Sequence, residues 1–489
     1  MTTNLPDNWA DPYSCDHSTT LALRINGSQV FGPKTYEIAN PATEKTIATG
    51  TIASEANLQS ALQSSATAYA TWRQTPVQKR AAILARAAAV IREYADALAL
   101  TMTLEQGKPI AQSKIEIMAS AETFDWYAAE ALRINGRAMP SRTAGGRQST
   151  HPEPIGPVAA LTPWNFPALL AARKIAPALA AGCTCILKPS EETPASAIAL
   201  ADALAIAGLP DGVLNVVFGI PAQISETLIA SPVIRKVSFT GSIPVGRHLA
   251  EFAGRHLKPC TLELGGHAPV LVMDDADPVK AAAISAIGKT RNSGQVCTSP
   301  TRFFVQDRVH DAFLSNFTRA MAAIAVGDGT AADADMGPLA NARRTEALEA
   351  LVTDAVSKGA KIETGGKRVG NIGYFFAPTV LSNVPDDARI MNEEPFGPIA
   401  IVNRFSKLDE AFARANRVEI GLAGYAFTDN HPRAVEISEG LEVGMVGINS
   451  FTVSQIEAPF GGVKDSGFGY EGGAEGLDGY LHQKYVHHA

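Results

Sequence analysis

The stretch GPVAALTPWNFPALLAARKIAPALAAGCTCILKPSEETPASAIALADALAIAG, residues 156–208, alternates short apolar runs with longer helical patterns. It predicts strands at 156–163 and 183–190, a helix at 167–182 interrupted near Pro177, and a helix at 193–208 closed by Gly208. Strands at 212–219 and 235–242 and a helix at 245–254 continue the alternation. Strands that alternate with helices of this length are typical of a parallel, doubly wound sheet, so we predict an α/β fold.

The flanking regions extend this unit. The first fifty residues read as short strands and turns, and residues 54–106 follow a helical pattern that begins at a capped Ser54. A second set of strands and helices runs from about 270 to 447, and GYLHQKYVHH (479–488) is expected to be an edge strand available to another subunit. A chain of 489 residues allows roughly three domains.

Composition excludes several classes of protein. The net charge of -7 argues against nucleic acid or an anionic membrane as partner, and no apolar stretch approaches the ~20 residues that span a bilayer. The first residues show no basic segment followed by an apolar run, so a secretory signal is not expected. The cysteines are odd in number and irregularly spaced, so we expect a reducing cytoplasm and no disulfide framework; they are Cys15, Cys183, Cys185, Cys260 and Cys297. The histidines show no ligand-like spacing, so no catalytic metal is expected.

One cysteine lies in polar, glycine-containing company, in RNSGQVCTSP (291–300). A thiolate nucleophile needs a lowered pKa or an adjacent base, and no histidine lies within ten positions of Cys297. A nearby glycine lets backbone approach a ligand, and the Cys297 amide can serve an oxyanion. The alternative is a small buried hydrophobe, which is the commoner role of a cysteine.

Two other polar residues suit the same chemistry. Glu263, in TLELGGHAPVLV (261–272), would have a raised pKa if buried, as a general base requires; the alternative is a partly exposed residue at a strand end. Asn165, in LTPWNFP (161–167), carries an amide donor that can stabilise an oxyanion. The alternative for Asn165 is an ordinary turn asparagine.

Two turns suit a nucleotide. ILKPSEETP (186–194) places Lys188 at a strand end and Glu191 before a helix, where open α/β sheets bind ligands. FTGSIPVG (239–246) places Gly241 and Gly246 between a strand and a helix, as a pyrophosphate requires. This is not the full G-x-G-x-x-G motif, so it is a weak indication by itself.

Together these pieces resemble the aldehyde dehydrogenase superfamily. PWNFP, KPSE, FTGS, LELGG, GQVC, EEPFGP and PFGGVKDSGFG occur in the family's order, and the resemblance runs from NPATEK to YLHQKY. It implies a Rossmann-like NAD-binding domain (1–131 and 153–263), an α/β catalytic domain (264–454) and a small β oligomerisation element (132–152 and 471–489). It also implies a homodimer or homotetramer.

The resemblance assigns roles to the residues. Cys297 matches the nucleophile, Glu263 the base that acts through water, and Asn165 with the Cys297 amide the oxyanion hole. The residues that match the family's cofactor contacts are Trp164, Lys188, Glu191, Ser242, Glu394 and Phe396. Lys188 is also assigned a catalytic role. Glu457 matches a carboxylate that assists proton relay. Cys297 would attack the aldehyde, the oxyanion would expel hydride to the nicotinamide, and Glu263 would activate the water that hydrolyses the thioester. Glu191 would repel a 2′-phosphate, so NAD is preferred, with NADP as the alternative.

Within the superfamily the chain most resembles the succinate-semialdehyde dehydrogenase branch. Arg173, Arg291 and Ser454 match the residues that bind the substrate carboxylate, which a guanidinium pairs with bidentately. The alternative is that either arginine bridges local acids. Thr290, Ser299 and Phe451 depart from the branch pattern. The runner-up substrates are therefore 2-oxoglutarate semialdehyde and other carboxylate-bearing or small aliphatic aldehydes.

Three rival classes fit the sequence less well. A CoA-acylating dehydrogenase typically lacks the hydrolytic base, an inactive paralogue would tolerate loss of Cys297 or Glu263, and a pure binding module has no need of this set of residues.

Overall fold

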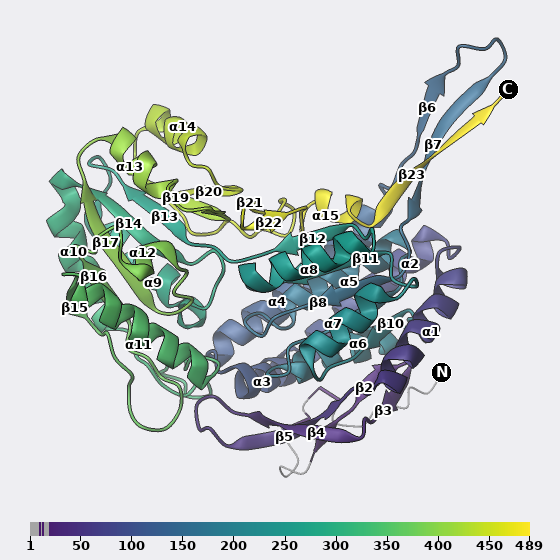
Figure 1. Ribbon diagram of the computed structural model, residues 1–489, viewed down its shortest axis with the longest axis horizontal. Coiled ribbons are helices and arrows are strands. Elements are labelled where there is room, and N and C mark those ends of the chain that lie inside the picture. Colours follow the sequence, from purple (N-terminus) through teal and green to yellow (C-terminus); the bar gives the residue numbers. More distant parts are fainter. Residues whose placement is uncertain (1–8, 11, 14–18) are drawn as a thin grey trace.

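The stretch that opens with residues 156–208 forms the centre of the first large sheet. Figure 1 shows the computed structural model, which describes residues 9–10, 12–13 and 19–489; Cys15 lies outside these residues. The central strands are parallel, in the order β10-β9-β8-β11-β12. Their bounds are β8 Val158–Leu161, β9 Cys185–Lys188, β10 Leu214–Val216, β11 Lys236–Thr240 and β12 Cys260–Glu263. The chain leaves β8 toward β9 on one side and later returns to β11 on the other, so a topological switch point lies at the end of β8, where such sheets bind ligands.

Short antiparallel strands extend this sheet at both edges. β2 (Leu23–Ile25) and β3 (Ser28–Val30) add to β10, and β22 (Gly467–Phe468) adds to β12. The N-terminal part also holds a small sheet of β1 (Thr20–Leu21), β5 (Thr46–Ile52) and β4 (Lys34–Ala39). The expected mixture of strands and turns in the first fifty residues is therefore confirmed for the described residues.

The helices around the first sheet follow the predicted alternation with one correction. They are α1 Glu55–Trp72, α2 Val77–Glu93, α3 Ala95–Gln106, α4 Ile110–Ala131, α5 Leu169–Ala181, α6 Pro194–Ile206, α7 Pro221–Ala230 and α8 Ile243–Arg255. Ser54 caps α1 in a reciprocal pair with Asn57, as expected. The interruption predicted near Pro177 is wrong, because α5 runs on through it. Every residue of α5 from Leu170 on is buried, so packing on all sides outweighs one missing N–H donor.

The second large sheet carries the other half of the molecule. Its parallel strands have the order β16-β17-β14-β13-β19-β20, with β15 antiparallel at the edge. They are β13 Ala268–Val272, β14 Pro300–Gln306, β15 Lys361–Thr364, β16 Thr379–Ser382, β17 Ile399–Phe405, β19 Ala423–Phe427 and β20 Met445–Ile448. The helices are α9 Pro278–Thr290, α10 Asp307–Ala322, α11 Ala342–Ser357, α12 Arg389–Asn392, α13 Leu408–Ala415 and α14 His431–Gly440. The α/β fold class is thus confirmed, whereas the domain boundaries remain predictions.

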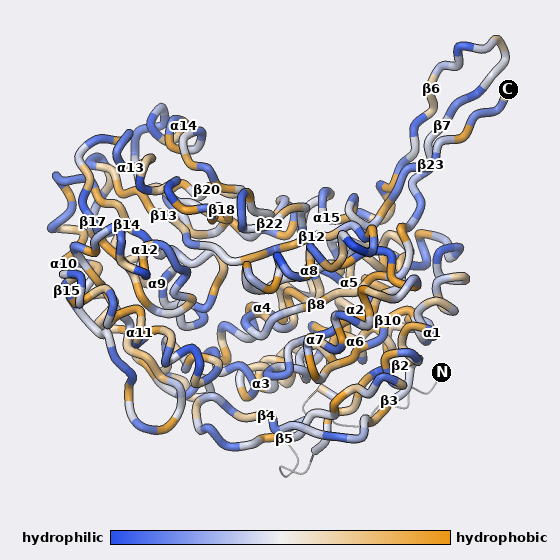
Figure 2. Tube along the Cα trace, viewed as in Figure 1, coloured by the Kyte–Doolittle hydropathy of each residue, from blue (hydrophilic) through white to orange (hydrophobic). Residues whose placement is uncertain are grey.

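A three-stranded arm projects from the body (Figure 1). It consists of β6 (Arg137–Pro140), β7 (Arg147–Pro154) and β23 (Leu481–His488), all antiparallel. Figure 2 shows long hydrophilic stretches in this arm, whereas hydrophobic residues gather in the body. β23 pairs with β7 along its whole length and leaves its other edge free among the described residues. An exposed strand edge of this kind can pair with another chain. The dimer or tetramer itself stays a prediction. No helix among the described residues has the length and apolarity to cross a bilayer.

Candidate active site

The turn that carries Cys297 lies between α9 and β14. The Ser299 amide donates to the Val296 carbonyl across this turn at 2.9 Å. From behind, the Tyr425 hydroxyl donates to the Thr298 carbonyl at 2.7 Å, and the buried Lys289 ammonium donates to the Ser299 hydroxyl at 3.1 Å. These bonds fix the backbone on both sides of the thiol.

The Cys297 thiol opens into a cavity of about 520 Å³. Desolvation by the surrounding protein raises the pKa of Cys297 to about 12; the nearby carboxylates of Glu394 and Glu263 add to the rise, while Arg173 and Arg291 oppose it. The thiol is therefore neutral at pH 7 in this state. A base or a further positive charge is needed to make it a nucleophile.

Glu263 ends β12 and is buried, with 2% of its surface exposed. Neither of its carboxylate oxygens has a hydrogen-bond partner among the described residues. Burial raises its pKa well above the usual value, the charge of Glu471 adds to the rise, and Lys174 and Arg173 oppose it. The alternative of a partly exposed strand-end residue is wrong, whereas the role of Glu263 as a general base stays a prediction.

The carboxylate beside Glu263 is Glu471, which the sequence reasoning missed. The Lys174 ammonium forms a buried ion pair with Glu471 and donates to the Ser238 hydroxyl at 3.2 Å. Glu457, the carboxylate expected to assist proton relay, is exposed at the surface. That expectation is wrong. The available signals were a lysine inside the apolar helix 167–182 and a glutamate directly after GFGY.

Asn165 lies just beyond β8, at the switch point, and lines the cavity with Cys297. Its side-chain amide donates to the Gln295 carbonyl at 3.1 Å, and its amide oxygen has no partner among the described residues. Because the side chain bonds across to the nucleophile loop rather than to its own turn, the alternative of a turn asparagine is not supported. The second N–H of this side chain has no acceptor among the described residues, and its role in an oxyanion hole stays a prediction.

Five of the expected cofactor residues line this same cavity: Trp164, Gly241, Ser242, Glu394 and Phe396. The rings of Trp164 and Phe396 meet edge to face at 5.5 Å. Glu394 accepts from the Gly266 amide at 3.1 Å, and burial raises its pKa to about 7. Three further lining residues were missed by the sequence reasoning: Asn341, Arg343 and Arg344, the last of which donates to the Phe396 carbonyl.

The cavity has the polar groups that a dinucleotide needs. Ser242 precedes α8 but makes no side-chain capping bond, so the first amides of that helix are available to a pyrophosphate. The Thr240 hydroxyl is buried on the cavity wall without a partner among the described residues. A Cβ on Gly265 would lie 2.6 Å from a Glu394 oxygen, so glycine keeps that approach open. These residues fit a dinucleotide.

The remaining expected cofactor residues lie outside the cavity wall. A Cβ on Gly246 would lie 2.3 Å from Leu264, so this glycine allows α8 to pack closely on the sheet. Lys188, at the end of β9, forms an ion pair with Glu191 at 2.5 Å, without the angles of a hydrogen bond. The ammonium group of Lys188 therefore pairs with Glu191 and not with a residue beside the Cys297 thiol.

A second pocket, of about 180 Å³, lies beside the turn that carries Cys297. Arg291, Ser454 and Thr298 line it, and Phe166 lines both this pocket and the larger cavity. Arg173 lies behind Ser454 and donates to its hydroxyl at 2.7 Å. Within the described part of the chain neither arginine has a carboxylate within 4.0 Å, so the alternative that they bridge local acids is wrong.

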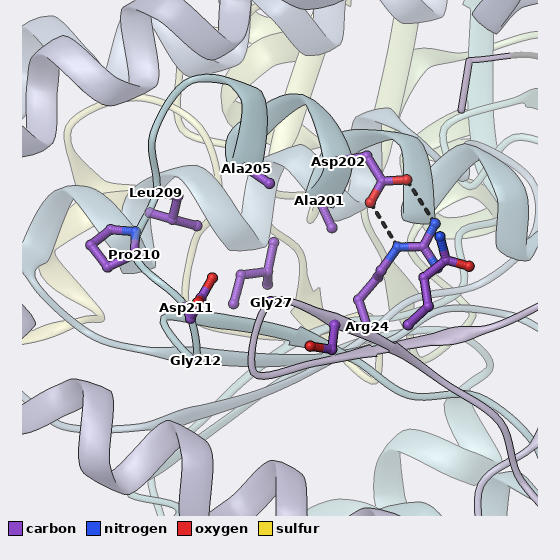
Figure 3. A pocket seen from close by; sticks show the side chains of 12 residues that line it. Arg24, Gly27, Ala201, Asp202, Ala205, Leu209, Pro210, Asp211 and Gly212 are labelled. Carbon is purple, nitrogen blue, oxygen red and sulfur yellow. Dashed lines mark hydrogen bonds and ion pairs between the residues drawn. The ribbon is translucent and has the colours of Figure 1, made fainter. Parts of the chain in front are cut away.

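Another cavity, of about 240 Å³, lies between the β2–β3 hairpin and α6 (Figure 3). Its main charged groups, Arg24 and Asp202, are joined by two hydrogen bonds of 2.7 and 2.8 Å. The two groups satisfy each other, and the cavity contains none of the predicted catalytic residues. The chemistry is therefore expected at Cys297.

Known proteins are similar to this chain in sequence and in fold. The model of the aldehyde dehydrogenase family matches residues 30–486. A 4-(hydroxymethyl)benzenesulfonate dehydrogenase from Comamonas testosteroni is 49% identical, over 92% of this chain and 94% of that protein. A succinate-semialdehyde dehydrogenase (NADP(+)) from Escherichia coli is 41% identical, over 92% and 93%. The crystal structure of succinate-semialdehyde dehydrogenase from Burkholderia pseudomallei superimposes with a TM-score of 0.94 at 43% identity, over 96% of this chain and 98% of that one. The chain belongs to the aldehyde dehydrogenase family.

Proposed function

We propose that this aldehyde dehydrogenase oxidises an aldehyde that carries a distal carboxylate, with succinate semialdehyde giving succinate, and that it prefers NAD. The observation that carries the proposal is the pair of arginines beside the nucleophile turn, both without a carboxylate partner among the described residues. A guanidinium that lacks an internal counter-ion near a pocket is suited to bind an anionic group of the substrate.

Cys297 is the proposed nucleophile. Its thiol gives its proton to water, and the thiolate attacks the aldehyde carbon. The resulting oxyanion receives hydrogen bonds from the Asn165 side chain and the Cys297 amide. When bound, a dinucleotide would supply the acceptor for the hydride of this adduct. Trp164, Ser242, Glu394 and Phe396 would hold that cofactor in the 520 Å³ cavity.

Glu263 is the proposed base for the second half of the reaction. Its unpartnered carboxylate takes a proton from water, and the water attacks the thioester on Cys297. Glu471 and Lys174 form a buried ion pair near Glu263. The charge of Glu471 raises the pKa of Glu263, and that of Lys174 lowers it. A hydrolytic base of this kind supports a non-acylating enzyme.

The carboxylate proposal predicts a contrast between two substrates. Arg291→Ala should lower kcat/KM for succinate semialdehyde strongly, because losing one partner of a desolvated charge pair costs about 2–5 kcal/mol, or about 30-fold and more. Butanal, with the same carbon count and no charge, should be little affected. Steady-state kinetics on both aldehydes measures this.

Arg173 needs a different control, because its charge also lowers the pKa of Glu263 and Cys297. Arg173→Ala is therefore expected to slow both substrates, and succinate semialdehyde more. Ser454→Ala removes the hydroxyl between Arg173 and the pocket without removing charge. If Arg291→Ala reduces both substrates equally, the arginine is structural and the semialdehyde proposal fails.

The cofactor proposal rests on Glu191. A 2′-phosphate beside this carboxylate would be repelled, so kcat/KM for NAD should exceed that for NADP. Glu191→Gln keeps the shape, removes the charge and frees Lys188, so it should raise kcat/KM for NADP. A wild-type ratio in favour of NADP, as the name of the Escherichia coli relative would indicate for that protein, would contradict the proposal.

A second candidate substrate is an aromatic aldehyde with a distal anionic group. Phe166, Phe451, Ile115 and Leu169 give the 180 Å³ pocket apolar walls, which suit a ring better than a short flexible chain. The Comamonas relative is named for a benzenesulfonate. Comparing 4-formylbenzenesulfonate and 4-formylbenzoate with succinate semialdehyde distinguishes the two candidates.

A further inference from the structure

A buried ion pair lies behind the proposed oxyanion loop. Lys108 precedes α4 and Glu116 lies within it; both side chains are 1% exposed, and their charged atoms are 2.5 Å apart. Removing two charges from water is costly, and such a pair often adds no net stability. We therefore looked for a local geometry that this pair maintains, and found it in the loop that carries Asn165.

Each member of the pair holds one end of the loop that carries Asn165. The Lys108 ammonium donates to the Asn165 carbonyl at 2.7 Å and lies over the Phe166 ring at 4.2 Å. The other carboxylate oxygen of Glu116 accepts from the amides of Ala168 and Leu169 at 3.0 and 3.2 Å, at the start of α5. The pair thus fixes the peptide after Asn165 and the helix that follows.

The same carbonyl is tied to the nucleophile loop. Asn292 donates to the Asn165 carbonyl at 2.8 Å and receives a hydrogen bond from Gln106 at 2.9 Å. Asn292 and Ser293 have positive φ values of 48° and 56°, which cost about 1–2 kcal/mol each for non-glycine residues. A strained loop of this kind needs such contacts to keep its shape.

We propose that Lys108, oriented by Glu116, is a positioning residue for this reaction. By holding the backbone carbonyl of Asn165, it directs the side-chain amide of Asn165 at the oxyanion formed on Cys297. The inference rests on the proposed role of Asn165 and extends it to residues more than 45 positions away in sequence. Lys108 and Glu116 are not expected to contact the reacting atoms.

The test is a double-mutant cycle with Asn165. Lys108→Met with Glu116→Gln removes both charges at nearly constant volume and keeps an acceptor for the α5 amides. We expect kcat to fall about 10–100-fold, since misplacement of a catalytic group by 1 Å costs on that order. The dissociation constant of NAD should change little; KM for the aldehyde is not a criterion, because Lys108 and Glu116 also line the 180 Å³ pocket. Adding these changes to Asn165→Ala should cause no further loss, because both act through one amide.

A matched control removes an exposed ion pair between α4 and the neighbouring helix α3. Lys114→Met with Asp96→Asn breaks an exposed pair and should leave kcat unchanged. If the buried double variant does not fold, Lys108→Arg keeps the charge but moves the donor, and its smaller loss of kcat should likewise vanish in the Asn165→Ala background.

The outcomes separate the two levels of the proposal. A folded Lys108 variant with wild-type kcat, or a loss additive with that of Asn165→Ala, overturns the positioning role while Asn165 keeps its own. Wild-type kcat in Asn165→Ala alone removes the oxyanion role and this inference with it, and leaves the roles of Cys297 and Glu263 in place.

Discussion

Cys297→Ala is expected to lower dehydrogenase turnover by about 10³-fold or more, the loss that follows deletion of a catalytic nucleophile. Among the described residues no other cysteine lines the cavity, and Cys183 and Cys185 are fully buried elsewhere. Dinucleotide binding should stay near normal, since the residues of the cavity wall are unchanged. Turnover is measured by steady-state absorbance of reduced cofactor, and binding by titration.

The control is Cys260→Ala, which removes another partly exposed thiol at the start of β12. That variant should keep its turnover. Retention of more than about 1% of the wild-type rate by Cys297→Ala, against the ~10³-fold loss expected, would contradict the assignment.

Glu263→Gln should separate the two halves of the reaction. The variant is expected to release a burst of reduced cofactor and then to turn over about 10²–10⁴-fold more slowly, the usual contribution of a general base. Rapid-mixing absorbance resolves the burst from the steady state. Because burial and Glu471 raise the pKa of Glu263, the wild-type rate of thioester hydrolysis should rise with pH as this carboxyl group loses its proton, and the variant should lose that dependence.

Glu457→Gln is the matched control, because it neutralises an exposed carboxyl group of the same type. It should turn over normally. A Glu263→Gln variant without any burst would mean that Glu263 acts earlier, on the Cys297 thiol whose pKa burial raises to about 12. Unchanged turnover would remove Glu263 from the mechanism.

The sequence by itself determined the fold class, and it predicted which turn carries the nucleophile. Apolar runs of strand length alternate with helical patterns between 156 and 254, and this local periodicity is enough to predict a parallel sheet. The motifs around Cys297, Glu263 and Asn165 are short and contiguous, so they could be recognised without knowing what lies beside them. Local patterns failed at Pro177, where packing around a fully buried helix outweighed the preference of one residue.

Only the tertiary structure decided which charges meet. Lys174 and Glu471 are 297 positions apart, so no local pattern could pair them. The same holds for the choice of Glu471 over Glu457, since a glutamate has the same sequence signature whether it lies at the surface or beside a second carboxylate. The pKa of a buried group depends on the charges and the loss of water around it, and these are set by chain segments that only the folded sheet brings together.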